Sequence, residues 1–263
     1  MPKAQLKNFK MSYYDNGNSD IPLILIHGFP LDKRMWELQI EKLLWSTRII
    51  TPDLRGHGES EIGSRQYSIE SYADEIVEFI SIMGIKKFSL GGFSMGGYIA
   101  MNLVKRYPEK VSSLLLLHTK YESDSDEVKI GREDMAKLAE TSGANPIAER
   151  LIPRLLTQNS VDNRPDLVDR VHRMITQCSI EGIAGDLRAM AAREDFTNTL
   201  KDLNIPTLIV SGKNDVVIPS SESEKMHNLI NNSQLHILQE TSHLSNLEKS
   251  DEFNTIISKF INQ

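Results

Sequence analysis

The hydrophobic pattern of residues 1–120 predicts strands and helices that alternate along the chain. Short apolar runs, each typical of a buried strand, occupy residues 22–26, 47–52, 87–90 and 111–117. Helical patterns follow the first three of these runs, at residues 33–44, 69–83 and 98–106. A hairpin over residues 4–14 precedes them. Because strands that alternate with helices usually pair in parallel, the pattern predicts a parallel sheet with helices on both faces.

The alternation breaks between residues 121 and 200, where the pattern is helical throughout. Residues that interrupt helices divide this stretch into about four helices; they are Gly143, Pro146, Pro165 and Gly182. Strand-like runs return after residue 200. The sequence therefore predicts a core made of residues 1–120 and 201–263, with residues 121–200 as a helical insertion.

The turn after the third apolar run carries the sequence Gly-Phe-Ser-Met-Gly at residues 92–96. Between a strand and a helix, Gly-x-Ser-x-Gly is typical of a sharp turn that holds the serine in a strained backbone conformation with its hydroxyl exposed. Gly92 and Gly96 let the strand and the helix pass close together, and the helix N-terminus favours negative charge near Ser94. The pattern predicts a nucleophile at Ser94; the alternative is a glycine-rich turn with a helix-capping serine.

A hydrolase with this turn needs an acid and then a histidine downstream, each in a loop after a strand. The strand-like run 206–212 is followed by a loop that carries Asp215, and the run 234–238 is followed by a loop that carries His243. A terminal helix starts shortly after His243. Because loops at the carboxyl ends of parallel strands meet at one sheet edge, we expect Ser94, Asp215 and His243 to converge there.

The remaining histidines are possible bases in principle, but none combines a loop after a late strand with the expected chain order; they are His27, His57, His118, His172, His227 and His236. We expect His27 to order the turn that presents Phe29. Asp186, within the insertion, is expected to be a solvated surface charge. Cys178 is expected to be a small buried apolar group rather than a nucleophile.

Two backbone N–H groups complete the candidate site. The first apolar run ends at the same sheet edge and is followed by a glycine turn that leaves the N–H of Phe29 free. The N–H of Met95, directly after Ser94, is the second candidate. Two N–H groups aimed at one oxygen stabilise the negative charge that develops there during acyl transfer.

Five segments resemble, in order and spacing, the α/β-hydrolase superfamily; they are His-Gly-Phe-Pro at 27–30, Asp-Leu-Arg-Gly-His-Gly-Glu-Ser at 53–60, Gly-Phe-Ser-Met-Gly-Gly at 92–97, Ser-Gly-Lys-Asn-Asp at 211–215 and Ser-His at 242–243. Within the superfamily, the chain looks most like the small esterases and lactonases related to 3-oxoadipate enol-lactonase. The resemblance implies a mostly parallel eight-stranded sheet with helices on both faces. It also implies a helical cap, inserted between two late strands, that roofs the active site.

Composition excludes several classes of protein. A net charge of −6 and a pI near 5.7 argue against a nucleic-acid surface. The chain has no His-Glu-x-x-His motif, no paired cysteines and no phosphate-binding glycine loop, so we expect neither a metal nor a cofactor. One cysteine, a first segment without a signal-peptide pattern and no apolar run that could span a membrane lead us to expect a cytoplasmic protein. The oligomeric state is left open.

The charge of the insertion bears on the substrate. Its 15 Asp and Glu residues exceed its 10 Lys and Arg residues, a balance of −5, which disfavours a polyanionic substrate. One arginine could still hold a single carboxylate, and four candidates are left open: Arg150, Arg154, Arg173 and Arg188. Apolar candidates for the pocket are equally well explained by packing within the insertion; they are Met135, Leu138, Leu151, Ile152, Leu155, Met174, Ile175 and Met190.

These observations predict a hydrolase that cleaves a carboxylic ester or lactone of a small, mainly apolar substrate through Ser94, His243 and Asp215 and an acyl-enzyme. Serine rather than aspartate in the turn argues against the haloalkane dehalogenase and epoxide hydrolase branches. A perhydrolase, an acyltransferase or a C–C bond hydrolase would use the same three residues. A small-molecule receptor or signalling protein would also retain them. The natural substrate and its acyl chain length are left open.

Overall fold

An eight-stranded sheet forms the centre of the molecule, with the strand order β1-β2-β4-β3-β5-β6-β7-β8. The computed structural model describes residues 1–17, 21–64 and 66–263. The strands are β1 (Lys3–Gln5), β2 (Lys10–Asp15), β3 (Leu23–Ile26), β4 (Ile49–Pro52), β5 (Phe88–Phe93), β6 (Val111–Leu117), β7 (Thr207–Gly212) and β8 (Ser233–Leu238). β2 runs antiparallel to β1 and β4, whereas the other neighbouring strands pair in parallel. The sheet is therefore mostly parallel, as predicted.

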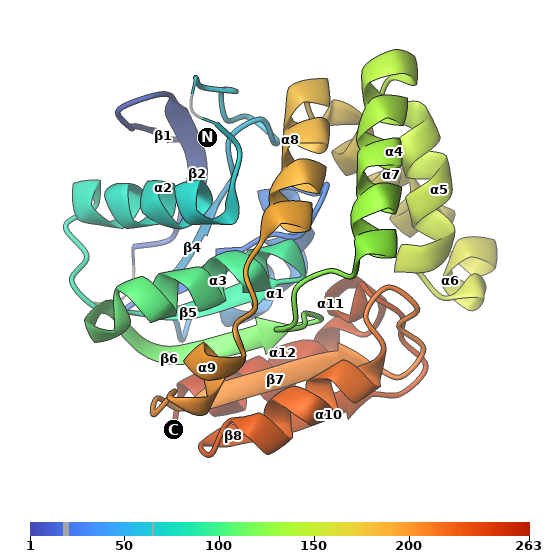
Figure 1. Cartoon of the computed structure of the whole chain (residues 1–263). Coiled ribbons are helices and arrows are strands. Elements are labelled where there is room, and N and C mark those ends of the chain that lie inside the picture. The colour runs from blue at the N-terminus through green and yellow to red at the C-terminus, as the bar shows by residue number, and fades with distance from the viewer. Residues whose placement is uncertain (18–20, 65) are drawn as a thin grey trace.

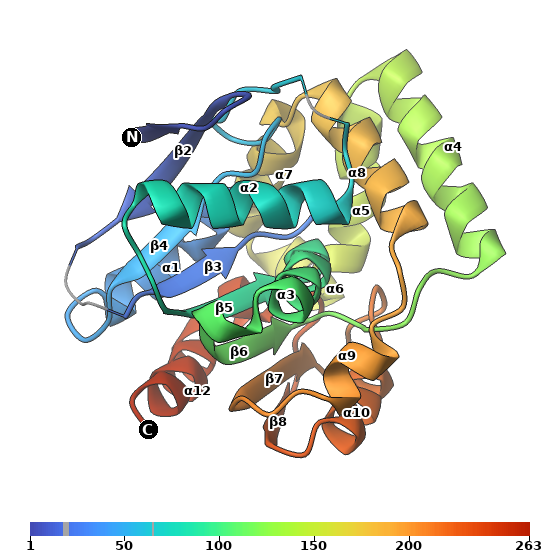
Figure 2. The same ribbon diagram turned by 60° about the vertical axis from the view of Figure 1, so that its left-hand side comes forward.

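Helices cover both faces of this sheet. In Figure 1, α2, α3 and α10 lie in front of the sheet, and α1 and α12 lie behind it; Figure 2 shows the same arrangement after a turn of 60° about the vertical axis. The helices outside the predicted insertion are α1 (Glu37–Leu43), α2 (Ile69–Ile82), α3 (Met95–Arg106), α10 (Ser220–Leu229), α11 (Ser245–Glu248) and α12 (Ser250–Ile261). Short 3₁₀ turns precede α1 at Lys33–Trp36 and β6 at Pro108–Lys110.

Three strands inside the sheet are largely buried on both faces. Every residue of β3 and β7 is buried, and so are the last four residues of β6. This double burial explains why these strands appear in the sequence as continuous apolar runs instead of alternating patterns.

Six helices lie between β6 and β7, in a stretch of the chain that the structure describes fully. They are α4 (Asp126–Ser142), α5 (Asn145–Leu155), α6 (Gln158–Asn163), α7 (Pro165–Gln177), α8 (Ile180–Ala192) and α9 (Thr197–Lys201). Gly143 ends α4 with a φ of 81°, and Pro165 begins α7, as their positions in the sequence indicate. Gly182, by contrast, lies in the first turn of α8. The hydrophobic pattern did not predict where α6 and α8 begin. Each of these helices follows a capping residue; before α6 this residue is Thr157, whose hydroxyl accepts from the Ser160 N–H.

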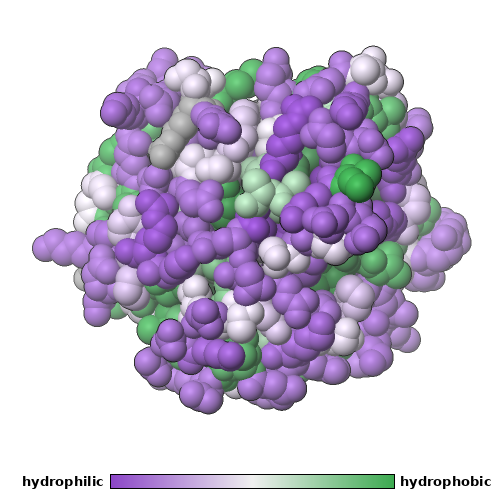
Figure 3. All heavy atoms as spheres, viewed as in Figure 1, coloured by the Kyte–Doolittle hydropathy of each residue, from purple (hydrophilic) through white to green (hydrophobic). Residues whose placement is uncertain are grey.

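The surface agrees with the polar composition. On the face in Figure 3, hydrophilic side chains predominate and hydrophobic ones occur in small, separate groups. Over the part of the chain that the structure describes, no helix is long and apolar enough to cross a membrane.

Candidate active site

Ser94 lies at the turn between β5 and α3, in the strained conformation that its motif predicts. Its φ is +52°, a backbone conformation that residues other than glycine rarely adopt. A Cβ atom added to Gly92 would lie 2.2 Å from the Gly96 carbonyl oxygen, and one added to Gly96 would lie 2.6 Å from the Ile26 carbonyl oxygen. The two glycines are therefore required by the close approach of strand and helix.

Asp215 and His243 meet at the same edge of the sheet, after β7 and β8. His243 Nδ1 lies 2.7 Å from Asp215 Oδ2. The other carboxylate oxygen, Oδ1, accepts from the backbone N–H groups of Val217 and Ile218, each at 2.9 Å. Burial alone would raise the pKa of Asp215, but the charge of His243 and the hydrogen bonds from the imidazoles around it hold that pKa well below its usual range. Asp215 is therefore a fixed carboxylate.

The loop that carries His243 is held on both sides of the histidine. The Ser242 N–H donates to Glu248 Oε2 at 2.6 Å, and the Leu244 N–H donates to the Leu155 carbonyl at 3.0 Å. The Ser242 hydroxyl donates to the Arg154 carbonyl at 3.2 Å. Because Arg154 and Leu155 end α5, the position of this helix is tied directly to the position of the histidine.

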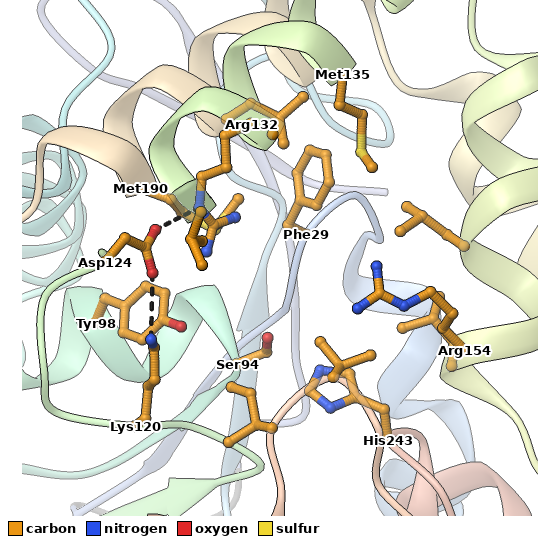
Figure 4. Close-up of a pocket in the computed structure, with 17 residues that line it drawn as sticks. Phe29, Ser94, Tyr98, Lys120, Asp124, Arg132, Met135, Arg154, Met190 and His243 are labelled. Carbon is orange, nitrogen blue, oxygen red and sulfur yellow. Dashed lines mark hydrogen bonds and ion pairs between the residues drawn. The ribbon is translucent and has the colours of Figure 1, made fainter. Parts of the chain in front are cut away.

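Ser94 and His243 both line a cavity of about 430 Å³. Figure 4 shows the Ser94 hydroxyl pointing into this cavity and the His243 ring beside it. Most of the other lining residues are apolar and come from the core, as Tyr98 and Ile218 do, or from α4, α5 and α8. Among the eight apolar candidates, those that line the cavity are Met135, Leu151, Leu155 and Met190. The other four, Leu138, Ile152, Met174 and Ile175, pack in the hydrophobic core.

The two backbone N–H groups predicted to bind an oxyanion flank Ser94. Phe29 lines the cavity, and Met95 is the first residue of α3. Neither N–H donates a hydrogen bond to any residue that the structure describes. His27 stabilises the first turn, because its Nδ1 lies 3.0 Å from the Gly28 carbonyl and its Nε2 accepts from the Leu54 N–H at 3.0 Å. These contacts match the expectation for His27.

Positive charge gathers on the side of the cavity opposite His243. The buried carboxylate of Asp124 contacts three cations: Arg132 at 2.5 Å, Arg193 at 2.8 Å and Lys120 at 3.3 Å. Figure 4 shows two of these ion pairs, to Lys120 and Arg132. Of these four residues, Lys120, Arg132 and Asp124 line the cavity, so the lining of this wall has an excess of one positive charge although the whole chain carries −6.

Arg154 adds a cation beside His243. Its side chain lines the cavity, and Figure 4 shows the guanidinium directed into it. Among the described residues, none forms a hydrogen bond or an ion pair with this guanidinium. Of the other three arginine candidates, Arg188 is bound to Glu133 and Glu140 on the surface, and Arg150 and Arg173 do not line the cavity. The structure thus singles out Arg154.

Sequence reasoning missed His118, which follows β6. Its Nδ1 lies 2.9 Å from Asp215 Oδ2, so two imidazoles share one carboxylate oxygen. Ligand atoms of His118, Asp215 and His243 lie within 4.8 Å of one another, a spacing that could also suit a metal ion. The contacts of 2.7 and 2.9 Å place hydrogen-bonded protons between these atoms, and hydrogen bonding accounts for the cluster.

The prediction that Asp186 is a solvated charge is wrong. Its side chain is fully buried on α8, where Oδ2 lies 3.0 Å from His57 Nε2 and Oδ1 accepts from the Tyr72 hydroxyl. His57 Nδ1 lies 3.1 Å from the Arg55 carbonyl. Burial lowers the pKa of His57, but its interactions with Cys178 and Asp186 outweigh burial and hold that pKa well above its usual value. A buried ion pair therefore joins α8 to the loop after β4. Cys178 is buried, as predicted.

Comparison with known proteins shows the family to which this fold belongs. A family model described as alpha/beta hydrolase fold matches residues 21–250, and the chain belongs to this family. It is 28% identical to 3-oxoadipate enol-lactonase 2 of Acinetobacter baylyi over 249 residues, which cover 93% of this chain and 90% of that protein.

Solved structures give the same result. An esterase from Thermogutta terrifontis, with malate bound, has a TM-score of 0.96 and 32% identity and covers 100% of this chain and 98% of its own. The enol-lactonase from Burkholderia xenovorans has a TM-score of 0.92 and 25% identity and covers 100% of both chains. The resemblance to this group of esterases and lactonases is confirmed.

Proposed function

We propose that the protein is a serine hydrolase that cleaves a carboxylic ester or a lactone through an acyl-enzyme on Ser94. The observation that carries the proposal is the contact of 2.7 Å between His243 and Asp215 at the wall of the cavity into which Ser94 points. An ionised carboxylate can only accept a hydrogen bond, so His243 Nδ1 carries the proton. His243 Nε2 is then the nitrogen available to Ser94.

The reaction follows from this tautomer. His243 Nε2 takes the Ser94 hydroxyl proton as Oγ bonds to the carbonyl carbon, and Asp215 stabilises the imidazolium that results. The N–H groups of Phe29 and Met95 stabilise the oxyanion. His243 then gives the proton to the leaving oxygen, whose bond to carbon breaks. Water, deprotonated by His243, releases the acid from Ser94 by the same steps.

We also propose that residues 121–200 act as a cap. The support is that α4, α5 and α8 supply one wall of the cavity and the core supplies the other. The hydrogen bonds from the His243 loop to the end of α5 couple this cap to the base. Movement of α5 would therefore displace both the substrate pocket and His243.

The substrate that fits best is a small ester or lactone that carries one carboxylate. The unpaired guanidinium of Arg154 supports this choice, since it is a hydrogen-bonding cation at an otherwise mainly apolar wall. The name of one relative agrees: 3-oxoadipate has two carboxylates, and its enol-lactone uses one of them and leaves the other free. The acidic surface of the insertion still disfavours a polyanion.

The test is turnover of p-nitrophenyl acetate, p-nitrophenyl butyrate and a γ-lactone by wild type, Ser94→Ala and a control, Ser221→Ala, which alters an exposed serine on α10. We expect activity in the wild type and the control and a loss on the order of 10⁶ in kcat for Ser94→Ala. Unchanged turnover by Ser94→Ala would overturn the assignment. Saturable ester binding by the wild type without turnover would instead indicate a receptor.

A further inference from the structure

His118 shares the Asp215 carboxylate with the proposed base. We propose that His118 is a positioning residue: it fixes the orientation of Asp215 and sets the pH range in which His243 is free to accept a proton. The two imidazoles lie nearly perpendicular, with ring centroids 5.4 Å apart and an interplanar angle of 78°. The inference rests on the proposed hydrolase function and assigns a role to a residue outside the nucleophile, base and acid.

The protons in this cluster follow from its hydrogen bonds. Asp215 Oδ2 is an acceptor, so His118 Nδ1, at 2.9 Å, must donate to it. Burial lowers the pKa of His118, although the Asp215 carboxylate acts in the opposite direction. Because the pKa is lowered, the ring is neutral. A neutral ring with a proton on Nδ1 accepts at Nε2, and the Ser245 hydroxyl, 2.6 Å away, is the donor. The Ser245 hydroxyl therefore satisfies the second ring nitrogen in the tautomer that Asp215 requires.

The backbone and the aromatic neighbours hold the His118 ring in place. His118 has a φ of +50°, and its N–H donates to the Val210 carbonyl at 2.8 Å. Its ring stacks on Phe93, with centroids 5.1 Å apart. The charged or titratable groups that face it are Asp215 after β7, His243 after β8 and Glu248 on α11. A fully buried histidine in a strained conformation thus donates from a fixed position.

Because His118 and His243 share Asp215 Oδ2, His118 affects how readily His243 binds a proton. Asp215 Oδ2 stabilises protonated His243 through its negative charge, and a second donor on the same oxygen withdraws part of that charge. Without His118, Asp215 attracts a proton on His243 more strongly. His243 is then protonated, and unable to act as a base, at a higher pH. Asp215 also loses one of its four donors and is held less firmly.

The experiment is the pH profile of kcat/KM for p-nitrophenyl acetate with wild type, His118→Leu and His118→Asn. Asn carries its amide nitrogen as many bonds from Cα as His118 Nδ1 and tolerates a positive φ, so it keeps the donor. Leu removes the donor but is disfavoured at this φ. His118→Gly removes the donor without that penalty, and urea unfolding checks that each variant is folded. His172→Leu, on α7, is the control for loss of a histidine elsewhere.

For the Leu and Gly variants we expect the acid limb of the kcat/KM profile to move to higher pH by about one unit, which is a tenfold change in proton affinity. In the Asn variant we expect the acid limb at its wild-type position. An acid limb that stays at the wild-type position in both the Leu and the Gly variants would overturn the proposal, even if kcat or stability falls. A displaced limb that Asn fails to restore would overturn the donor role. A wrong hydrolase assignment would show separately, as unchanged turnover by the Ser94→Ala variant.

Discussion

Replacement of Arg154 by glutamine should remove the preference for substrates that carry a carboxylate. The guanidinium is the cation beside His243 without a partner among the described residues, and it is directed into the cavity. Glutamine keeps a hydrogen-bonding side chain but has no charge and ends two bonds closer to Cα than arginine does. The Arg154→Lys variant, which keeps the charge, separates the effect of charge from that of side-chain length.

The size of the effect follows from the contact that Arg154 can make. A hydrogen bond to a charged group contributes about 1.5–3 kcal/mol, which corresponds to a factor of about 10 to 150. A bare Coulomb estimate at 4 Å and an effective dielectric constant of 20 gives about 4 kcal/mol. Arg154 is exposed, so solvent and salt reduce this value. We therefore expect a loss of about 10-fold to 100-fold.

The assay compares mono-p-nitrophenyl succinate, which carries a carboxylate, with p-nitrophenyl butyrate, which does not. We expect Arg154→Gln to lower kcat/KM for the succinate ester by the stated factor and to leave the butyrate ester almost unchanged. Arg154→Lys should retain part of the preference, and Arg150→Gln, an exposed position on the same helix, should retain all of it. Equal losses on the two esters would refute the carboxylate-binding role.

Three further predictions concern the turn, the acid and the pH dependence of stability. Gly92→Ala should lower the free energy of unfolding by about 3 kcal/mol in urea denaturation, because the added Cβ would collide with the Gly96 carbonyl. The control is Gly131→Ala, since nothing lies within 4 Å of a Cβ added there. Equal free energies of unfolding for the two variants would contradict this reading. Asp215→Asn should lower kcat about 10⁴-fold in steady-state kinetics while the fold is retained, and a loss below about tenfold would argue against its role. Burial lowers the pKa of His27 to about 3 from 6.5, so the unfolded chain binds this proton first and stability falls as pH drops from 6.5 toward 3. His27→Gln should reduce that slope by up to about 1.4 kcal/mol per pH unit in urea titrations, and an unchanged slope would contradict the assignment.

The strands, the turn at Ser94 and the loops that carry Asp215 and His243 were predictable because each depends on a local sequence pattern. Continuous apolar runs mark strands that are buried on both faces, and the glycines around Ser94 mark a turn that other residues would block. The loops of Asp215 and His243 could be placed at one edge because parallel strands share a direction. These inferences needed no knowledge of tertiary contacts.

The features that the sequence did not reveal depend on contacts between distant segments. Asp186 lies 129 positions after its partner His57, and no periodicity links the two. The choice of Arg154 over Arg150 depends on how the end of α5 is fixed to the His243 loop. His118 could have been found by the same argument from strand ends, since β6 lies between β5 and β7, but the rule of chain order excluded it.

The central claim is that Ser94 is an activated nucleophile at the wall of this cavity. Incubation with a fluorophosphonate, followed by intact-mass measurement and peptide mapping, tests it most directly. We predict one phosphonyl group per chain on the peptide that contains Ser94, formed in proportion to the loss of esterase activity and absent in His243→Ala. Full activity in a chain that remains unlabelled, or a label on another serine, would contradict the account.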